Sequence, residues 1–196
     1  MTGDDPMRKV LYLLSELDEE QLDWMIDVGT QEWLNPGQVL VQEGQRISVL
    51  YLTLTGRFEV RTRERVVAEL GAGEIIGELS FLDSRPPAAT VNALEHVSVL
   101  SIPTARLSSK LKTDHVFGSK FYRALGVMLA HRLRDTTLLQ AYGSVERRMD
   151  SDVEEVGEFS PELLESLSLA GARFESLMQK LDGEKARAVG SGAKNS

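Results

Sequence analysis

Residue types suited to holding a sugar phosphate gather in one short stretch of this chain, residues 77–90. Gly77 has no Cβ, so a ligand can approach the backbone closely there. Glu78 lies between an apolar strand pattern and a leucine, and a carboxylate in such a place needs hydrogen-bond donors, such as a sugar hydroxyl. Ala88 and Ala89 are too small to shield their own N–H groups, and successive N–H groups in a turn form an anion-binding concavity.

Arg85 is the one basic residue of this stretch. A guanidinium beside such a turn would complete an anion site with charge-assisted hydrogen bonds. Pro86 and Pro87 separate it from the alanines, and proline offers neither a cation nor an N–H. A Gly-Glu pair at a strand end and small residues in a turn also occur in purely structural β proteins. The residues alone therefore leave ligand binding and a structural turn both open.

The elements around this stretch have the pattern of short strands. Between residues 33 and 103, apolar side chains alternate and glycines recur at short intervals, at Val39–Val41, Leu50–Leu54, Phe58–Val60 and Val91–Ile102. Period-two alternation indicates half-buried strands. Many short strands with regular turns predict an antiparallel jelly roll, a β-roll of the cupin type, in a mainly β fold with flanking helices.

Helical patterns flank the roll on both sides. Residues 1–32 predict two N-terminal helices, the second with Asp18 and Gln21 as a capping box and Gly29 as its end. Residues 104–143 predict a short helix over 104–112 and a long helix over 117–142.

The last third of the chain is more polar. Residues 144–160 are mostly acidic and predict a linker. Residues 161–183 predict an amphipathic helix that begins at Ser160 and Pro161. The tail, 184–196, has little to bury and is expected to be disordered.

Composition excludes several classes of protein. The formal net charge of −8 argues against a general nucleic-acid binder, and the chain has no cysteine. Its three histidines have no ligand spacing, and no Ser/His/Asp arrangement is legible, so we expect neither a metal nor a cofactor nor an enzyme. No apolar run approaches the ~20 residues that span a bilayer, and the N-terminus lacks the apolar core of a signal peptide. A cytoplasmic protein without membrane insertion is expected.

These motifs resemble the cyclic-nucleotide-binding domain family, the β-roll of catabolite-activator-type regulators, kinase regulatory subunits and gated channels. The family's phosphate-binding cassette reads Gly-Glu-Leu, a short helix, then Pro-Arg-Ala-Ala-Thr. Gly77-Glu78-Leu79 and Ala88-Ala89-Thr90 keep that spacing. Upstream turns agree as well, at Pro36-Gly37, Glu43-Gly44 and Thr55-Gly56, and the resemblance covers roughly residues 10–142.

The resemblance implies roles for individual residues. Glu78 would take the ribose 2′-hydroxyl, while Gly77, Leu79, Ala88 and Ala89 would supply backbone and walls. Pro87 stands where the family has its phosphate-binding arginine. Arg85 is therefore the candidate replacement, and a solvated loop arginine is the alternative.

The long helix adds to the resemblance. In catabolite-activator-type regulators this helix carries a hydroxyl pair that reaches the adenine, and Thr136 and Thr137 stand at the same spacing after Ala130. The resemblance thus implies cAMP in preference to cGMP. It also implies a homodimer through the helix 117–142, with the apolar face from Phe121 to Leu133 as its seam. The alternative is that this face packs on the chain's own roll.

The remainder after the long helix leaves no room for a winged helix-turn-helix, so DNA is not an expected partner. We expect a stand-alone, cAMP-responsive regulatory or adaptor protein that signals to an unknown protein partner. The helix 161–182 would be its output element, by extending the dimer seam or by docking into a partner's groove, or it would be a cap on its own domain. The alternative is an interaction protein that has kept the fold and, because of Pro87, no longer binds nucleotide.

Overall fold

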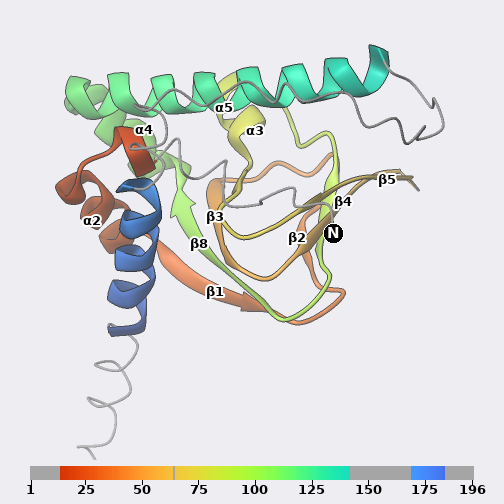
Figure 1. The fold of residues 1–196 in the computed structure, drawn as a ribbon, viewed down its shortest axis with the longest axis horizontal. Coiled ribbons are helices and arrows are strands. Elements are labelled where there is room, and N and C mark those ends of the chain that lie inside the picture. Colours follow the sequence, from red (N-terminus) through yellow and green to blue (C-terminus); the bar gives the residue numbers. More distant parts are fainter. Residues whose placement is uncertain (1–13, 64, 142–168, 184–196) are drawn as a thin grey trace, which may run out of the picture.

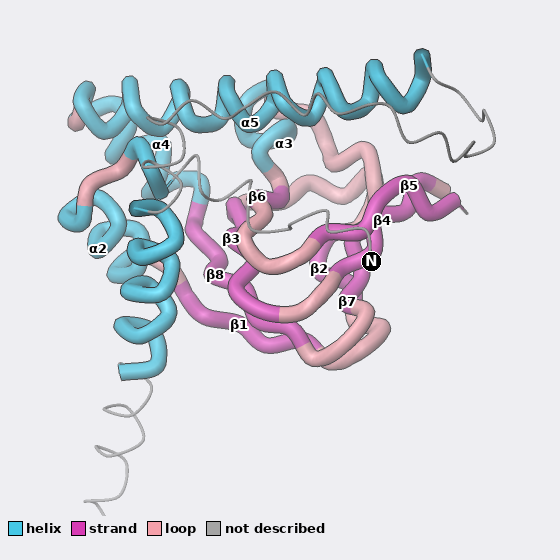
Figure 2. Tube along the Cα trace, viewed as in Figure 1, coloured by secondary structure: helices cyan, strands magenta, loops and turns pink. Residues whose placement is uncertain are grey.

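The structure, a computed structural model, describes residues 14–63, 65–141 and 169–183. Two four-stranded antiparallel sheets form its centre, with the strand orders β1-β8-β3-β6 and β2-β7-β4-β5 (Figure 2). The strands are β1 (Thr30–Leu34), β2 (Val39–Val41), β3 (Val49–Thr55), β4 (Phe58–Thr62), β5 (Arg65–Leu70), β6 (Ile75–Ile76), β7 (Thr90–Ala93) and β8 (Val97–Pro103). The predicted mainly β roll with flanking helices is confirmed.

Helices cover one side of this roll. They are α2 (Glu19–Val28), α3 (Glu78–Asp83), α4 (Thr104–Thr113), α5 (His115–Ala141) and a further helix over residues 169–183, here named the C-terminal helix. Figure 1 shows α5 running across the roll above α3, and the C-terminal helix, in blue, lying beside α2. Helices α4 and α5 occupy the segments expected for them.

Two strands differ from the sequence expectation. β1 begins at Thr30, inside the segment assigned to the N-terminal helices. It pairs with β8 from Thr30–Ser101 to Leu34–Val97. β5 was not singled out because its first five residues are all exposed, so its sequence shows no apolar alternation.

The strands of the first sheet divide their side chains between two cores. The outer core lies against the helices and takes Leu50, Leu52, Leu54, Leu100 and Ile102 from β3 and β8. The inner core lies between the sheets and includes Phe58, Val91, Val97 and Val99. The period-two alternation of β3 and β8 produces this division, because successive residues point to opposite faces.

The start and end of α2 follow from its sequence. The Asp18 carboxylate accepts from the Gln21 N–H at 3.0 Å, and the Gln21 side chain accepts from the Asp18 N–H at 3.1 Å. This is the predicted capping box. The helix ends at Gly29, where a Cβ would lie 2.6 Å from Leu100 Cδ1. A glycine is required there because α2 packs closely on β8.

The C-terminal helix packs on the chain's own domain. Ala170, Leu177 and Leu181 are buried in the outer core. The Arg173 guanidinium donates to the carbonyls of Leu14 and Ser15 at 2.7 and 3.1 Å. Of the two roles expected for this helix, residues 169–183 fill that of a cap, while residues 161–168, the segment 144–160 and the tail 184–196 lie outside the described residues.

The apolar face of α5 is largely used within the chain. Phe121, Leu125 and Met128 are at most 1% exposed and belong to the outer core. The expectation for this face was a dimer seam, with packing on the chain's own domain as the alternative, and the structure places these three residues in the chain's own core. Leu133, at the far end of that face, is 68% exposed.

Candidate functional site

Gly77 begins the short helix α3 in a backbone conformation that favours glycine. Its φ is +95°, in the left-handed region. A Cβ at this position would also lie 2.8 Å from Ile47 Cδ1 and 3.2 Å from the Val49 carbonyl oxygen. Both facts follow from the close approach of this turn to β3. Gly77 therefore sets the position of Glu78, the first residue of α3.

Glu78 is buried and Leu79 is not. Only 4% of Glu78 is exposed, so its carboxylate is turned into the protein, whereas Leu79 is 55% exposed. A buried carboxylate requires hydrogen-bonding partners. The arrangement suits Glu78 to a polar ligand and leaves Leu79 only its backbone to contribute.

The loop after α3 is fastened to the turn between β2 and β3. The Arg46 guanidinium donates to the Ser84 carbonyl at 2.9 Å, and the Gly44 N–H donates to the Pro87 carbonyl at 2.9 Å. The Thr90 hydroxyl accepts from the N–H of Glu43 at 3.0 Å. Three hydrogen bonds thus hold the loop 84–90 on a fixed frame. Pro87 takes part through its carbonyl, the one backbone hydrogen-bonding group that a proline retains.

Ala88 and Ala89 offer backbone donors at the end of this loop. Within the part of the chain that the structure describes, neither N–H donates to another residue. Ala88 is exposed and Ala89 is half-buried. Two consecutive N–H groups in a bend can together receive an anion.

Arg85 lies in the loop after α3 and is turned to solvent. Its side chain is 83% exposed, with Nε 3.7 Å from Asp83 Oδ2. It lines a cavity of about 260 Å³ together with Arg46 and Ser84, and Glu78 is not among the lining residues of that cavity. Glu78 and Arg85 therefore do not share this cavity.

Thr136 and Thr137 both belong to α5, whose backbone is described to Ala141. Their side chains lie outside the described residues. Their expected contact with a purine base therefore stays a prediction.

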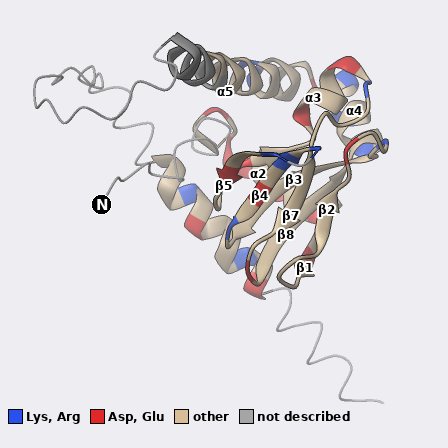
Figure 3. Cartoon of the chain, turned by 90° about the vertical axis from the view of Figure 1, so that its right-hand side faces the viewer, with Lys and Arg blue, Asp and Glu red and all other residues tan. Residues whose placement is uncertain are grey.

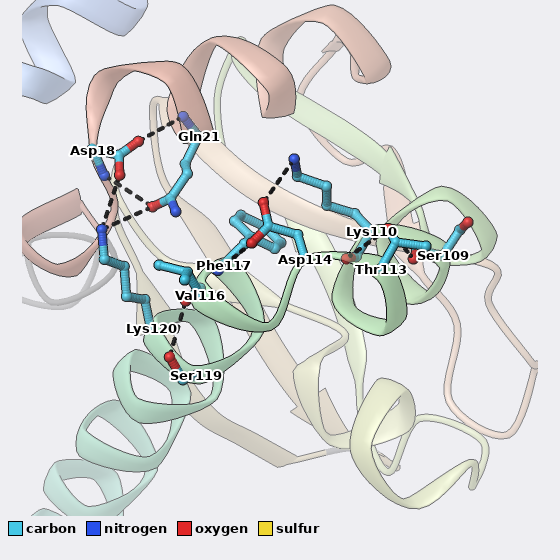
Figure 4. Close-up of polar contacts among 10 residues, drawn as sticks. All are labelled: Asp18, Gln21, Ser109, Lys110, Thr113, Asp114, Val116, Phe117, Ser119 and Lys120. Atoms are coloured by element: carbon cyan, nitrogen blue, oxygen red, sulfur yellow. Dashed lines mark hydrogen bonds and ion pairs between the residues drawn. The ribbon is translucent and has the colours of Figure 1, made fainter.

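Contacts that the sequence did not reveal join α5 to the N-terminal helices. The Lys120 ammonium donates to Asp18 Oδ2 at 2.9 Å and to Gln21 Oε1 at 3.4 Å, so it extends the capping box (Figure 4). Asp114 accepts from the Phe117 N–H at 2.9 Å, where α5 begins. Opposite charges 102 residues apart in sequence carry no local signal, so only the fold could bring Lys120 to Asp18.

These contacts also lower the pKa of two carboxyl groups, those of Asp18 and Asp114. The hydrogen bond from Lys120 lowers the pKa of Asp18 below its ordinary value, and the Gln21 N–H adds to this effect. The hydrogen bond from the Phe117 N–H lowers the pKa of Asp114, with a further contribution from Lys110. Both carboxylates are therefore held in their charged form, Asp18 at the start of α2 and Asp114 between α4 and α5.

Charge is mixed over the described part of the chain, where basic and acidic positions interleave (Figure 3). Residues 14–63, 65–141 and 169–183 hold no group of three His, Asp or Glu that could bind a metal ion. None of the helices within those ranges is both long and apolar enough to cross a membrane.

Comparison with known proteins places this geometry in a family. Residues 31–114 match the model of the cyclic nucleotide-binding domain. A cAMP-dependent protein kinase regulatory subunit from Yarrowia lipolytica is 30% identical over 129 residues, which is 65% of this chain and 31% of that subunit. The chain thus spans about a third of that relative's length.

Solved structures agree. The N-terminal domain of a transcriptional regulator from Streptomyces coelicolor A3(2) is 32% identical, with a TM-score of 0.53 over 68% of this chain and 95% of that one. A cyclic nucleotide-binding domain from Methylobacillus flagellatus KT shares the fold, at 23% identity and a TM-score of 0.60 over 71% and 86% of the two chains. Residues 31–114 of this chain therefore belong to the cyclic nucleotide-binding domain family.

Proposed function

We propose that this chain is a cytoplasmic regulatory protein that binds a cyclic nucleotide beside α3, with Glu78 accepting the ribose hydroxyl. The observation that carries the proposal is the burial of Glu78, only 4% exposed, directly after Gly77 in the segment that the family model matches. A sugar hydroxyl is a donor from which a buried carboxylate can accept a hydrogen bond.

Backbone groups take the phosphate in this proposal. The N–H groups of Ala88 and Ala89 supply two donors, while Pro87 supplies none and the Arg85 side chain is turned to solvent. A hydrogen bond to a charged group is worth about 1.5–3 kcal/mol, and each ~1.4 kcal/mol is tenfold in affinity. We therefore expect binding about ten- to a hundredfold weaker than in a cassette with its arginine.

The base would be adenine. Support comes from the position of Thr136 and Thr137 in the sequence of α5, which matches the hydroxyl pair of catabolite-activator-type regulators. The proposed ligand is thus cAMP in preference to cGMP.

Output would pass through the helices to a protein partner. Helix α3 contacts α5 through Phe81 and Phe121, and α5 contacts the N-terminal helices through Lys120. A nucleotide would shift this assembly only by binding two of its arrangements with different affinity. A homodimer through α5, with the exposed Leu133 in its seam, stays part of the proposal.

Calorimetric titration with cAMP and then cGMP tests the site. Glu78→Gln keeps the size of the side chain and removes its charge, so it should abolish measurable cAMP binding. Arg85→Gln is the matched control and should leave the affinity for cAMP unchanged. A loss of binding in Arg85→Gln would instead show that this arginine moves to the phosphate.

One alternative function has an observation in its favour. Pro87 carries no charge, and the side chain of Arg85 is mostly exposed to solvent. The loop 84–90 therefore has no cation held in place for the phosphate. If millimolar cAMP and cGMP give neither heat nor a thermal shift, the proposal fails. The chain would then be an interaction protein that retains the fold without the ligand.

A further inference from the structure

The cavity that Arg85 lines contains Gly77 and Ser80 of the cassette in its wall but not Glu78. It has a volume of about 260 Å³, and its polar lining comes from the β2–β3 turn, α3 with its loop, and α4: Arg46, Ser80, Ser84, Arg85, Thr104 and Ser108. Gly77, Ser80 and Ser84 fall at helical spacing on one stripe of the chain. This cavity and the proposed nucleotide site therefore use different faces of the same short helix.

Two guanidinium groups with unused donors line this cavity. Arg46 donates through one nitrogen to the Ser84 carbonyl. Within the described residues it forms no ion pair with a carboxylate. Arg85 has one ion-pair partner there, Asp83, at 3.7 Å and with both side chains well exposed. Such exposed pairs are weak. Since a guanidinium carries five N–H donors in a planar fork, most of the donors of both arginines are open to a ligand.

The remaining polar lining is neutral and rich in hydroxyl groups. Ser80, Ser84, Thr104 and Ser108 contribute, and no carboxylate lines the cavity. The Thr104 hydroxyl donates to the Ser48 carbonyl at 3.0 Å, which fixes its oxygen as an acceptor at the wall. Paired guanidinium groups with serine hydroxyls suit a phosphate, which accepts hydrogen bonds from both.

We propose that this cavity binds the phosphate group of a small phosphate monoester, with Arg46 and Arg85 as its cationic ligands. The volume exceeds what a bare phosphate needs, so part of the attached organic group would also have room in the cavity. The inference goes beyond the proposed cyclic-nucleotide site and does not depend on it. A dianionic monoester is also the species that two cations select over a monoanionic cyclic diester.

A ligand in this cavity would connect three parts of the fold. Arg46 comes from the turn that fastens the loop 84–90, Arg85 comes from that loop itself, and Ser108 comes from α4. Binding would hold α3 against α4 and would raise the unfolding temperature, since a ligand that binds only the folded state stabilises it.

The test is titration of the full chain with inorganic phosphate and, separately, with ribose 5-phosphate, followed by calorimetry and thermal shift. Both should bind, and ribose 5-phosphate more tightly, since its sugar is also enclosed. Arg46→Gln and Arg85→Gln should each weaken binding by about tenfold or more, the loss expected for one charged hydrogen bond. Asp83→Asn should strengthen phosphate binding, because it removes the carboxylate that competes for the Arg85 guanidinium. The side-chain oxygen of the asparagine can still accept from the backbone N–H of Arg85.

Glu78→Gln separates this site from the proposed nucleotide site. It should leave the affinity for phosphate and ribose 5-phosphate unchanged, whatever it does to cAMP. Phosphate binding that is lost in Glu78→Gln and kept in both arginine variants would overturn the inference and place the anion in the cassette. Absence of binding at millimolar phosphate and ribose 5-phosphate in the unmodified chain would overturn it as well. Arg46→Lys, which keeps the charge, should retain more affinity than Arg46→Gln.

Discussion

Phe81 of the cassette helix meets Phe121 of α5 edge to face, with ring centroids 6.2 Å apart and an interplanar angle of 84°. Phe121 stacks on Phe117 at 5.7 Å, and Phe117 meets Trp24 of α2 edge-on at 5.4 Å. A continuous line of aromatic rings therefore joins the cassette to the N-terminal helices. Packed rings transmit a displacement of one element to the next because protein interiors are densely filled.

The first prediction concerns the energy of this contact. Phe81→Leu and Phe121→Leu, made singly and together, should show a coupling energy of about 0.5–1.5 kcal/mol in urea unfolding, the usual worth of an aromatic pair beyond burial. Phe121→Leu alone should cost more than Phe81→Leu, since Phe121 is fully buried and Phe81 only partly so. Additive effects of the two substitutions would mean that the rings are not coupled.

The second prediction concerns the C-terminal helix. Arg173→Gln removes the guanidinium that donates to the Leu14 and Ser15 carbonyls, and we expect that helix to lose about 1–3 kcal/mol of protection. Hydrogen exchange of the amides of residues 169–183 should rise while that of β8 is unchanged. Arg106→Gln, on the exposed side of α4, is the control. Equal exchange in both variants would show that the other contacts, the buried apolar side chains and the Lys180–Asp23 pair, are sufficient to dock the helix.

The third prediction is a pH dependence that arises at Asp18. Its pKa is lowered in the folded state below the ordinary value of 3.8, chiefly by the hydrogen bond from Lys120. Its contribution to stability is therefore fully present above about pH 4 and is lost as the pH falls through the lowered pKa. Asp18→Asn should be less stable at pH 7, and the difference from the unmodified chain should shrink under strong acid. Urea unfolding at several pH values measures it; a constant difference across that range would contradict the assignment.

The fourth prediction compares two glycines of α5. A Cβ at Gly126 would meet nothing within 4 Å, whereas a Cβ at Gly118 would lie 3.2 Å from the Leu111 carbonyl oxygen. Gly126→Ala should stabilise the protein by about 0.5–1 kcal/mol, because alanine loses less backbone entropy in a helix. Gly118→Ala should gain less or destabilise, because α4 must shift to admit the methyl group. Thermal unfolding distinguishes them, and equal stabilisation by both would show that the α4–α5 contact yields easily.

Local signals in the sequence were sufficient for much of the fold. The capping box of Asp18 and Gln21 was legible because both partners lie within one helical turn. The strands β3 and β8 could be predicted because their apolar residues alternate over a long stretch. The start of β1 was predicted three residues too far along the chain, and β5 was not predicted at all. The residues of both strands are mostly exposed, so their sequences show little apolar alternation.

The candidate site was predicted in part, for a related reason. The spacing from Gly77 to Ala89 placed the cassette, and the family match over residues 31–114 agrees with it. No pattern along the chain indicated that Arg85 and Arg46 would line the same cavity, because Arg46 comes from the turn between β2 and β3. The apolar face of α5 was equally ambiguous, since a dimer seam and an internal core require the same side chains at the same spacing.

The sequence by itself indicated most of the strands and helices, where α2 begins, and where the Gly77-Glu78-Leu79 and Ala88-Ala89-Thr90 motifs lie. These depend on periodicity, caps and glycine positions, which act over a few neighbouring residues. Only the tertiary structure decided that Arg85 lines a cavity without Glu78, that Lys120 reaches Asp18, and that the C-terminal helix lies beside α2. Each of these depends on how elements far apart in the chain pack together. That packing decides which directions remain open to a side chain.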